Sequence, residues 1–571
     1  MSDSTSQPAS SITALQETPG TDRRDFLKQG AFAVGGAAAG VHAGTRRPAR
    51  RTPAKRKPPN ILVILVDQVR TPAWMPASAP QSSVTPHLWK LRSSSVSFEN
   101  HYTASNDCTP SRGVMLTGLY THQTGVMITG DSWLDPRFPT WGTLLRQMGY
   151  TTAYYGKWHL HPNAYAPMEQ YGFDGGTYPS PNGSPGQGTQ VDPYIARQVT
   201  QWLKANAGQE PWCATASFVN PHDIAWWWRY TSGINAEASP PSYATALPPN
   251  FETPQQLIER RKPALHRSLQ DTAAEAFGPV AFEGPEALPI WLNMMNTYLL
   301  LQSYVDAQIG NVLAALRAHP KVAANTVVLF TSDHGEYGGS HGMRGKGASA
   351  YEEAIRVPLY VHDPRGLLAK QVSVPRTGLT SSADFVPLLL SIATGSEDWR
   401  SEPTLAHLAE RHDIAAMCQK PSAPGRDWIL HATDEDVTEF ASQPYAADAP
   451  RHVIAIRTPQ AKLGVYSNWA PGGIEIQSAG QEVELYDYST QAGREEIENV
   501  AGHSALEEPL LQTLEEEAIP QELRQPLPSY LHLAQQEGLA NYQAVEIYSD
   551  ERRGITPPAR EREAQQEAQA L

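Results

Sequence analysis

The sequence contains few cysteines, no long apolar run and no excess of positive charge. Three cysteines in 571 residues exclude a disulfide scaffold and a cysteine-rich zinc or iron–sulfur site. No run of about 20 uninterrupted apolar residues occurs, so we expect no membrane span in the mature chain. The net charge is −14, and beyond residue 57 the chain has 35 Lys and Arg against 55 Asp and Glu. This acidity argues against nucleic acid as a partner.

The first 57 residues differ from the rest in composition. They contain 10 Lys and Arg against 4 Asp and Glu, and a soft apolar run at 30–44 follows the pair Arg23-Arg24. This order is typical of a twin-arginine export signal; the alternative is a basic tail with a chance arginine pair. We therefore predict a signal peptide at residues 1–43 and a basic linker at residues 44–57. The twin-arginine export machinery would be a partner, and the mature protein would be periplasmic or extracellular.

Four short apolar runs end in polar residues that can ionise or bind metal. Continuous apolar runs are typical of strands buried on both faces, hence of a mainly parallel sheet between helices in an α/β fold. Open sheets of this kind bind ligands at the carboxyl ends of their strands. The runs and the residues that follow them are Asn60–Val66 with Asp67, Thr151–Tyr155 with Lys157 and His159, Trp212–Val219 with His222, and Thr326–Thr331 with Asp333 and His334.

The pattern changes at about residue 425. Short apolar runs at 453–456, 463–466 and 483–486 are separated by turn-forming residues, which predicts a small antiparallel sheet. We therefore expect a catalytic domain at residues 58–424 and a minor C-terminal domain with a tail at residues 425–571.

Cys108 opens an apparent helix that runs to about Leu119. Pro110 fits the first turn of a helix, so the thiol would lie at a helix N-terminus, where negative groups are favoured. The alternative for a lone cysteine is a small buried hydrophobe, but its neighbours in the sequence are polar. A phosphatase-type thiolate loop would place cysteine and arginine six positions apart, and here Arg112 follows after four.

The motifs around these residues resemble those of the sulfatase family. Residues 108–112, Cys-Thr-Pro-Ser-Arg, are followed by Leu-Thr-Gly at 116–118, as in the family signature Cys-x-Pro-x-Arg. The resemblance continues through the four strand ends to Gly345-Lys346-Gly347 and covers roughly residues 58–500. It implies an alkaline-phosphatase-like fold, sulfate ester hydrolysis, and oxidation of the cysteine to formylglycine by a formylglycine-generating enzyme.

The resemblance also implies one divalent cation. Its ligands would be Asp67, Gln68, the modified Cys108, Asp333 and His334. The common sulfatase set has three Asp and one Asn around Ca²⁺, and here Gln68 and His334 depart from it. Imidazole favours Mn²⁺ and other transition ions, so Mn²⁺ and Mg²⁺ stay alternatives to Ca²⁺. This set also resembles choline sulfatases and phosphonate monoester hydrolases, so hydrolysis of phosphonate monoesters or phosphodiesters is the alternative function.

The remaining polar residues receive catalytic roles from the same resemblance. Arg112 and Lys157 would orient the formylglycine hydrate and neutralise sulfate oxygens, and His159 would hydrogen-bond the hydrate. His222 and Lys346 would contact the sulfate and assist departure of the alcohol. Taken singly, His222 is equally compatible with a loop histidine, and Lys346 with a solvated lysine in a glycine-rich loop. The substrate would be a small-molecule or saccharide sulfate ester.

Three consecutive tryptophans, at positions 226–228, follow His222 closely. One interpretation is a loop packed by bulky side chains, and the other is an aromatic wall for an aryl, sugar or quaternary-ammonium group.

Overall fold

The computed structural model describes residues 57–554, apart from residues 164, 178–185, 230–239, 439–440 and 471–475. The predicted signal peptide at 1–43, nearly all of the predicted linker at 44–57, and the end of the tail lie outside the described residues. Within the described part of the chain, no helix combines the length and the apolar character needed to cross a bilayer.

The four predicted strands are neighbours in an eight-stranded sheet of order β4-β3-β5-β1-β6-β7-β2-β8. Pairing is parallel except along β7, which runs antiparallel to both β6 and β2. The sheet is thus mixed and mainly parallel, as predicted. Its strands are β1 (Asn60–Asp67), β2 (Val96–Tyr102), β3 (Thr151–Gly156), β4 (Asp174–Gly176), β5 (Trp212–Pro221), β6 (Thr326–Ser332), β7 (Arg356–His362) and β8 (Thr380–Ser381).

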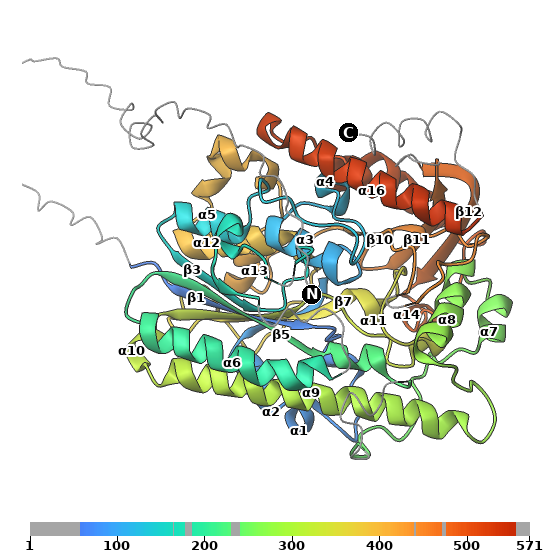
Figure 1. Ribbon diagram of the computed structural model, residues 1–571, viewed down its shortest axis with the longest axis horizontal. Helices are drawn as coiled ribbons and strands as arrows, with labels where there is room; N and C mark the ends of the chain where they lie inside the picture. Colours follow the sequence, from blue (N-terminus) through green and yellow to red (C-terminus); the bar gives the residue numbers. More distant parts are fainter. Residues whose placement is uncertain are drawn as a thin grey trace, which may run out of the picture. The chain divides into compact units, whose positions relative to one another are not determined.

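Both faces of this sheet are covered by helices, which explains why its central strands are continuously apolar. Alternate residues of β1 enter different cores: Ile61 and Val63 belong to one, and Leu62 and Ile64 to the other. Figure 1 shows two layers of helices with the sheet between them. One layer contains α2 (Pro86–Ser93), α6 (Gln187–Asn206) and α9 (Ala287–Arg317), and the other contains α3 (Cys108–Thr117), α5 (Trp141–Gln147), α12 (Phe385–Thr394) and α13 (Ile414–Gln419).

A second, four-stranded antiparallel sheet follows in the C-terminal part, with the order β12-β11-β10-β9. Three of its strands were predicted, but β9 was not, and neither was the long helix that follows the sheet. The strands are β9 (Ile429–Thr433), β10 (His452–Arg457), β11 (Ala461–Trp469) and β12 (Ile476–Asp487), and the helix is α16 (His532–Arg552).

Residues 240–290 form more regular structure than their proline-rich sequence indicates. Helices α7 (Pro254–Glu259) and α8 (Ala264–Phe277) lie in this stretch, and α9 begins at Ala287. The predicted α/β class and the small antiparallel sheet are confirmed.

Candidate active site

The register of the large sheet brings the predicted strand-end residues to one edge. Val66 pairs with Ser332, so Asp67 and Asp333 leave neighbouring strands at the same level. Asp67 itself pairs with Pro221, the residue before His222. Adjacent parallel strands therefore place these side chains together at the carboxyl edge, as expected for a fold of this class.

Gly156 allows Lys157 to join this group. Its φ is 106°, and a Cβ at this position would lie 2.0 Å from the Ser217 carbonyl oxygen. Only glycine tolerates both the conformation and the close approach. Lys157 then donates its backbone N–H to that same carbonyl, at 2.9 Å, which fixes the lysine at the sheet edge.

Helix α3 begins at Cys108, as predicted, and the second sheet supports the loop that leads into it. The backbone N–H of Ala432 donates to the carbonyl of Ala104 at 3.0 Å, and the Thr433 hydroxyl donates to the carbonyl of Asn106 at 2.8 Å. The backbone N–H of Asp107 donates to Glu435 at 3.3 Å. Strand β9 and the residues after it therefore position the start of α3.

Cys108 is fully buried, but polar groups surround its sulfur. The Sγ atom lies 3.1 Å from His334 Nε2, 3.5 Å from Lys157 Nζ and 3.8 Å from Asp67 Oδ1. One ligand atom from each of Asp67, Cys108, Asp333 and His334 lies within 4.8 Å of the others. Four of the five predicted metal ligands thus form one buried cluster.

Arg112 binds the two carboxylates of this cluster. Its Nε donates to Asp333 Oδ2 at 2.8 Å, and its Nη2 donates to Asp67 Oδ2 at 3.2 Å. The remaining terminal nitrogen donates to the Lys157 carbonyl and to the Ser217 hydroxyl. Every nitrogen of the guanidinium therefore donates to protein groups, which supports a role in positioning the carboxylates; contact with sulfate oxygens stays a prediction.

His334 is oriented as a metal ligand requires. Its Nδ1 lies 3.0 Å from the Gly335 carbonyl, which can only accept, so Nδ1 carries the proton. In the neutral ring the lone pair is then on Nε2, the atom that faces Cys108 and lies 3.5 Å from Asp67 Oδ1.

The charges in the cluster shift the ionisation of its members. Burial alone would raise the pKa of Asp67, but Lys157, with His222, His334 and Arg112, holds that pKa well below its usual range. Burial opposes the charge of Lys157 too, yet the neighbouring Asp67 raises the lysine pKa. Burial and the Asp67 charge raise the pKa of the Cys108 thiol well above its usual value. The unmodified thiol is therefore a poor nucleophile.

Gln68 and Lys346 are joined at the edge of the cluster. Lys346 Nζ donates to Gln68 Oε1 at 3.2 Å, and Gln68 Nε2 donates to Glu336 Oε2 at 2.5 Å. Glu336 also accepts the backbone N–H of Gly345 at 2.7 Å, so it ties the loop that carries Lys346 to Gln68. No role was predicted for Glu336, although its position two residues after His334 was a signal that could have identified it.

His159 and His222 are both buried close to these groups. Thr109 donates its hydroxyl to the His159 carbonyl at 2.9 Å, which holds His159 beside the start of α3. His222 follows β5 directly and lies near enough to Asp67 to lower the pKa of that carboxyl. The structure therefore brings all the predicted site residues to one region, while their individual roles stay predictions.

The three tryptophans divide between the two interpretations. Trp226 and Trp227 are buried and belong to a small apolar core with Trp291 and Tyr298, whereas Trp228 is 40% exposed. Bulky packing accounts for the first two residues. Cys213 and Cys418 likewise belong to the apolar core on one face of the large sheet.

Comparisons with known proteins agree with this geometry. The family model described as Sulfatase matches residues 59–396. An ulvan-active sulfatase of Formosa agariphila is 28% identical over 433 residues, covering 72% of this chain and 75% of that protein. A 2-O GAG sulfatase and the phosphonate monoester hydrolase of Silicibacter pomeroyi share the fold, each with a TM-score of 0.59 and 21% identity, over 83% of this chain and 97% of theirs. The chain belongs to the sulfatase family and is a hydrolase of sulfate esters.

Proposed function

We propose that the chain hydrolyses sulfate monoesters with a formylglycine made from Cys108 as the nucleophile. Membership of the family implies this modification and a metal ion. The observation that carries the proposal is the position of the Cys108 side chain, which ends next to His334, Lys157 and Asp67. A nucleophile at this position lies beside cationic groups and beside candidate metal ligands. Positive charge there is needed because the sulfate ester is anionic and would otherwise repel an anionic nucleophile.

The donor set fits a divalent cation. Two buried carboxylates and an imidazole nitrogen with a free lone pair lie close together, so several electron-pair donors surround a single position. Asp67, Asp333, His334 and the modified residue 108 would hold the ion, which would supply positive charge to the nucleophile and to the sulfate. Gln68 is a weaker candidate ligand, because its Oε1 already accepts from Lys346. Ca²⁺ is the first candidate ion, and the imidazole makes Mn²⁺ an alternative to it, with Mg²⁺ as the third.

The proposed steps use the two hydroxyl groups of the hydrated aldehyde. One hydroxyl loses its proton to solvent and bonds to sulfur; the bond from sulfur to the alcohol breaks, and the alcohol takes a proton from His222 or Lys346. His159 takes the proton of the second hydroxyl, the carbon–oxygen bond to sulfate breaks, and the aldehyde forms again. Water then restores the hydrate. Serine has no second hydroxyl with which to expel sulfate, so it would stay sulfated.

The substrate class is proposed from the relatives. The activity of the relative from Formosa agariphila on ulvan supports a saccharide sulfate, with small-molecule sulfate esters as the alternative. A second function, phosphonate monoester or phosphodiester hydrolysis, is favoured by His334 in the cluster and by the fold shared with a phosphonate monoester hydrolase. Rates on an aryl sulfate and on the matching aryl phosphonate monoester distinguish the two.

The proposal also requires processing of the chain. A formylglycine-generating enzyme would modify Cys108, and the twin-arginine export machinery would carry the protein to a periplasmic or extracellular location. The predicted boundary between a catalytic domain at 58–424 and a minor domain at 425–571 remains part of this proposal.

The experiment is mass spectrometry of the peptide that contains residue 108, combined with activity. We expect a peptide about 18 Da lighter than the cysteine form, because sulfur and two hydrogens leave and one oxygen enters. Activity should rise in proportion to the modified fraction. Cys108→Ser should abolish turnover, whereas the matched change Cys213→Ala in the apolar core should retain it. Full turnover from protein with only unmodified cysteine at 108 would refute the proposal.

A further inference from the structure

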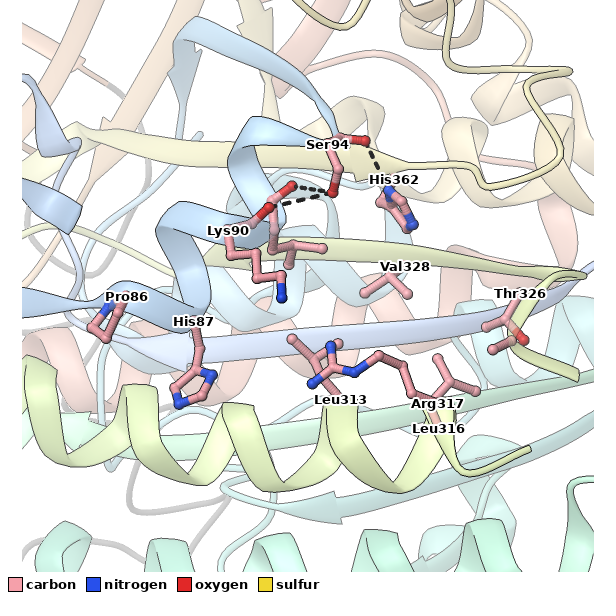
Figure 2. Close-up of a pocket in the computed structure, with 12 residues that line it drawn as sticks. Pro86, His87, Lys90, Ser94, Leu313, Leu316, Arg317, Thr326, Val328 and His362 are labelled. Atoms are coloured by element: carbon pink, nitrogen blue, oxygen red, sulfur yellow. Dashed lines mark hydrogen bonds between the residues drawn. The ribbon is translucent and has the colours of Figure 1, made fainter. Parts of the chain in front are cut away.

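A cavity of about 490 Å³ lies at the edge of the large sheet opposite the candidate active site (Figure 2). Its walls are α2, the last turns of α9, the first residues of β6 and the last residue of β7. Thr326 at the start of β6 lines the cavity, whereas Asp333 in the active site follows the end of the same strand. The length of β6 therefore separates the two sites.

The contact between α2 and α9 fixes two walls of this cavity. Asp306 on α9 accepts the backbone N–H groups of His87 and Leu88, at 3.0 and 2.8 Å, and so caps the start of α2. The next turn of α9 presents Gly310 to the ring of His87, where a Cβ would lie 2.7 Å from the ring. A glycine in the middle of a long helix costs stability, and here it makes room for the histidine.

The floor of the cavity is apolar. It consists of Leu91 from α2, Leu313 and Leu316 from α9, and Val328 from β6, each no more than 6% exposed. A volume of this size falls within the range of about 300–1,000 Å³ that is typical of sites for small organic ligands.

The rim of the cavity is basic. Lys90 from α2 and Arg317 from α9 flank it from two sides, with His87 and His362 beside them (Figure 2). No Asp or Glu is among the twelve residues that line it. Within the described part of the chain, neither Lys90 nor Arg317 forms an ion pair. Asp306 on α9 already accepts from the backbone at the start of α2, and Asp363, which follows His362, already accepts from Arg365 and from the backbone of Leu368.

From this arrangement we propose that the cavity binds an amphiphilic anion, an alkyl chain with a carboxylate or sulfur oxoanion head group. The alkyl chain lies on the leucine and valine floor, and the head group lies between Lys90 and Arg317. Two cations that face one cavity repel each other, and an anion between them removes that repulsion while forming charge-assisted hydrogen bonds. The chain as a whole has a net charge of −14, so a cavity with a basic rim has a locally positive potential that attracts anions.

Titration calorimetry with decanoate and decanesulfonate tests the proposal. The sulfonate has a carbon–sulfur bond, so hydrolysis of sulfate esters cannot consume it. Below the critical micelle concentration and at low salt, we expect one ligand per chain. Affinity should increase about fourfold for each methylene added between octanoate and dodecanoate, because the floor buries the alkyl chain. It should fall with added salt. Similar affinity for both head groups would assign the site to anions in general, and preference for one would name the head group.

A charge-matched pair of variants shows whether the bound ligand occupies this cavity. The double variant Lys90→Gln/Arg317→Gln should bind decanoate at least about tenfold more weakly, since each charge-assisted contact contributes on that scale. The control Arg197→Gln/Lys204→Gln removes the same two charges from the exposed face of α6 and should bind as the parent does. Ala323→Trp, which fills the cavity from its rim, should abolish binding.

Three outcomes would overturn the proposal. The first is no binding of either anion by the parent protein. The second is equal weakening in the cavity variant and in the α6 control. The third is loss of binding in Asp333→Ala instead of in Lys90→Gln/Arg317→Gln, which would place the ligand in the active site. Recruitment to anionic phospholipid vesicles that depends on Lys90 and Arg317, without binding of free decanoate, would instead identify a membrane contact.

Discussion

At the scale of single residues, the site consists of buried charges that compensate one another. Asp67 and Asp333 are fully buried, and both accept from Arg112. Breaking such a pair by removing one partner leaves an uncompensated buried charge, which costs far more than an exposed contact. Arg112 therefore holds both carboxylates, the two proposed anionic metal ligands, in place.

Substitutions at 333 and 334 test the metal site. Asp333→Ala should lose bound metal and activity together, since it removes one of two anionic ligands. His334→Asn should shift the metal preference further toward Ca²⁺, because an amide oxygen replaces a nitrogen ligand. Metal content by plasma mass spectrometry, with rates after reconstitution with each ion, measures both effects. The exposed changes Asp271→Ala and His503→Asn serve as controls, and equal metal content in all four variants would place the cation elsewhere.

At the scale of elements, α16 depends on two basic residues at the start of β10 and just before it. Glu546 on α16 accepts from Arg451 and lies 3.2 Å from His452 Nε2, and all three side chains are buried. The His452 ring also stacks on Trp469 of β11, with ring centroids 3.8 Å apart. Helix α16 is therefore held against the second sheet by charged as well as apolar contacts.

Replacing Glu546 should loosen this helix. Glu546→Gln should lower the free energy of unfolding by about 1–3 kcal/mol, because Arg451 then keeps only Asp550, and His452 only Asp434, as a carboxylate partner. Urea denaturation of this variant and of the exposed control Glu551→Gln measures the difference. A loss no larger than that of the control would contradict the assignment.

The same contact predicts a pH dependence. Burial opposes the charge on His452, but Glu546 and Asp434 raise its pKa above the ordinary 6.5. The folded state therefore binds a proton more tightly than the unfolded state, so this contribution is complete below pH 6.5 and is lost as the pH rises through the folded pKa. Burial likewise opposes the charge of Glu546, yet His452 and Arg451 lower its pKa, and its contribution is lost at acid pH. The difference in stability between the parent and Glu546→Gln should shrink as the pH rises through the raised pKa of His452, and again in acid.

At the scale of the whole molecule, the two sheets share a core. Tyr102 of β2 belongs to one core with Val453 and Ala455 of β10, and Val114 of α3 belongs to another with Leu430 of β9. A chain that ends at residue 424 should therefore expose this apolar surface and release the loop before Cys108. We expect such a chain to aggregate or to lack activity, as judged by circular dichroism and turnover, even where it is fully modified at 108. A stable, active 58–424 fragment would show that the second sheet is dispensable.

The proposed export depends on the arginine pair at positions 23 and 24. Arg23→Lys with Arg24→Lys should leave the protein in the cytosol, because the export receptor reads the arginine pair itself. Fractionation of cells that express each form measures this. Unchanged export of the double variant would remove the argument for a twin-arginine signal.

Much of the fold and the candidate site followed from local sequence. Residues 61–66 are apolar without interruption because helices cover both faces of their strand, and the polar residue that ends each such run marks the carboxyl edge. The Cys-x-Pro-x-Arg motif predicted Cys108 at the start of a helix, because proline is favoured in the first turn. Strand β9 was not predicted because it has only five residues, and no alternation of apolar and polar residues flanks it. Helix α16 was not predicted because some of its charged residues, such as Glu546, face buried partners and so weaken its amphipathic pattern.

The sequence by itself determined the fold class, the edge at which the site lies and the residue types that meet there, since periodicity and strand-end chemistry are local properties. Only the tertiary structure decided which of those residues form hydrogen bonds with one another. Arg112 donates to carboxylates that precede and follow it by 45 and 221 positions, Glu336 joins Gln68 to the Lys346 loop, and β9 supports the start of α3. The basic cavity is also tertiary, because its four walls come from segments between residues 86 and 362. Contacts between residues so far apart depend on the register of the sheet and on the packing of whole elements, and no short stretch of sequence encodes them.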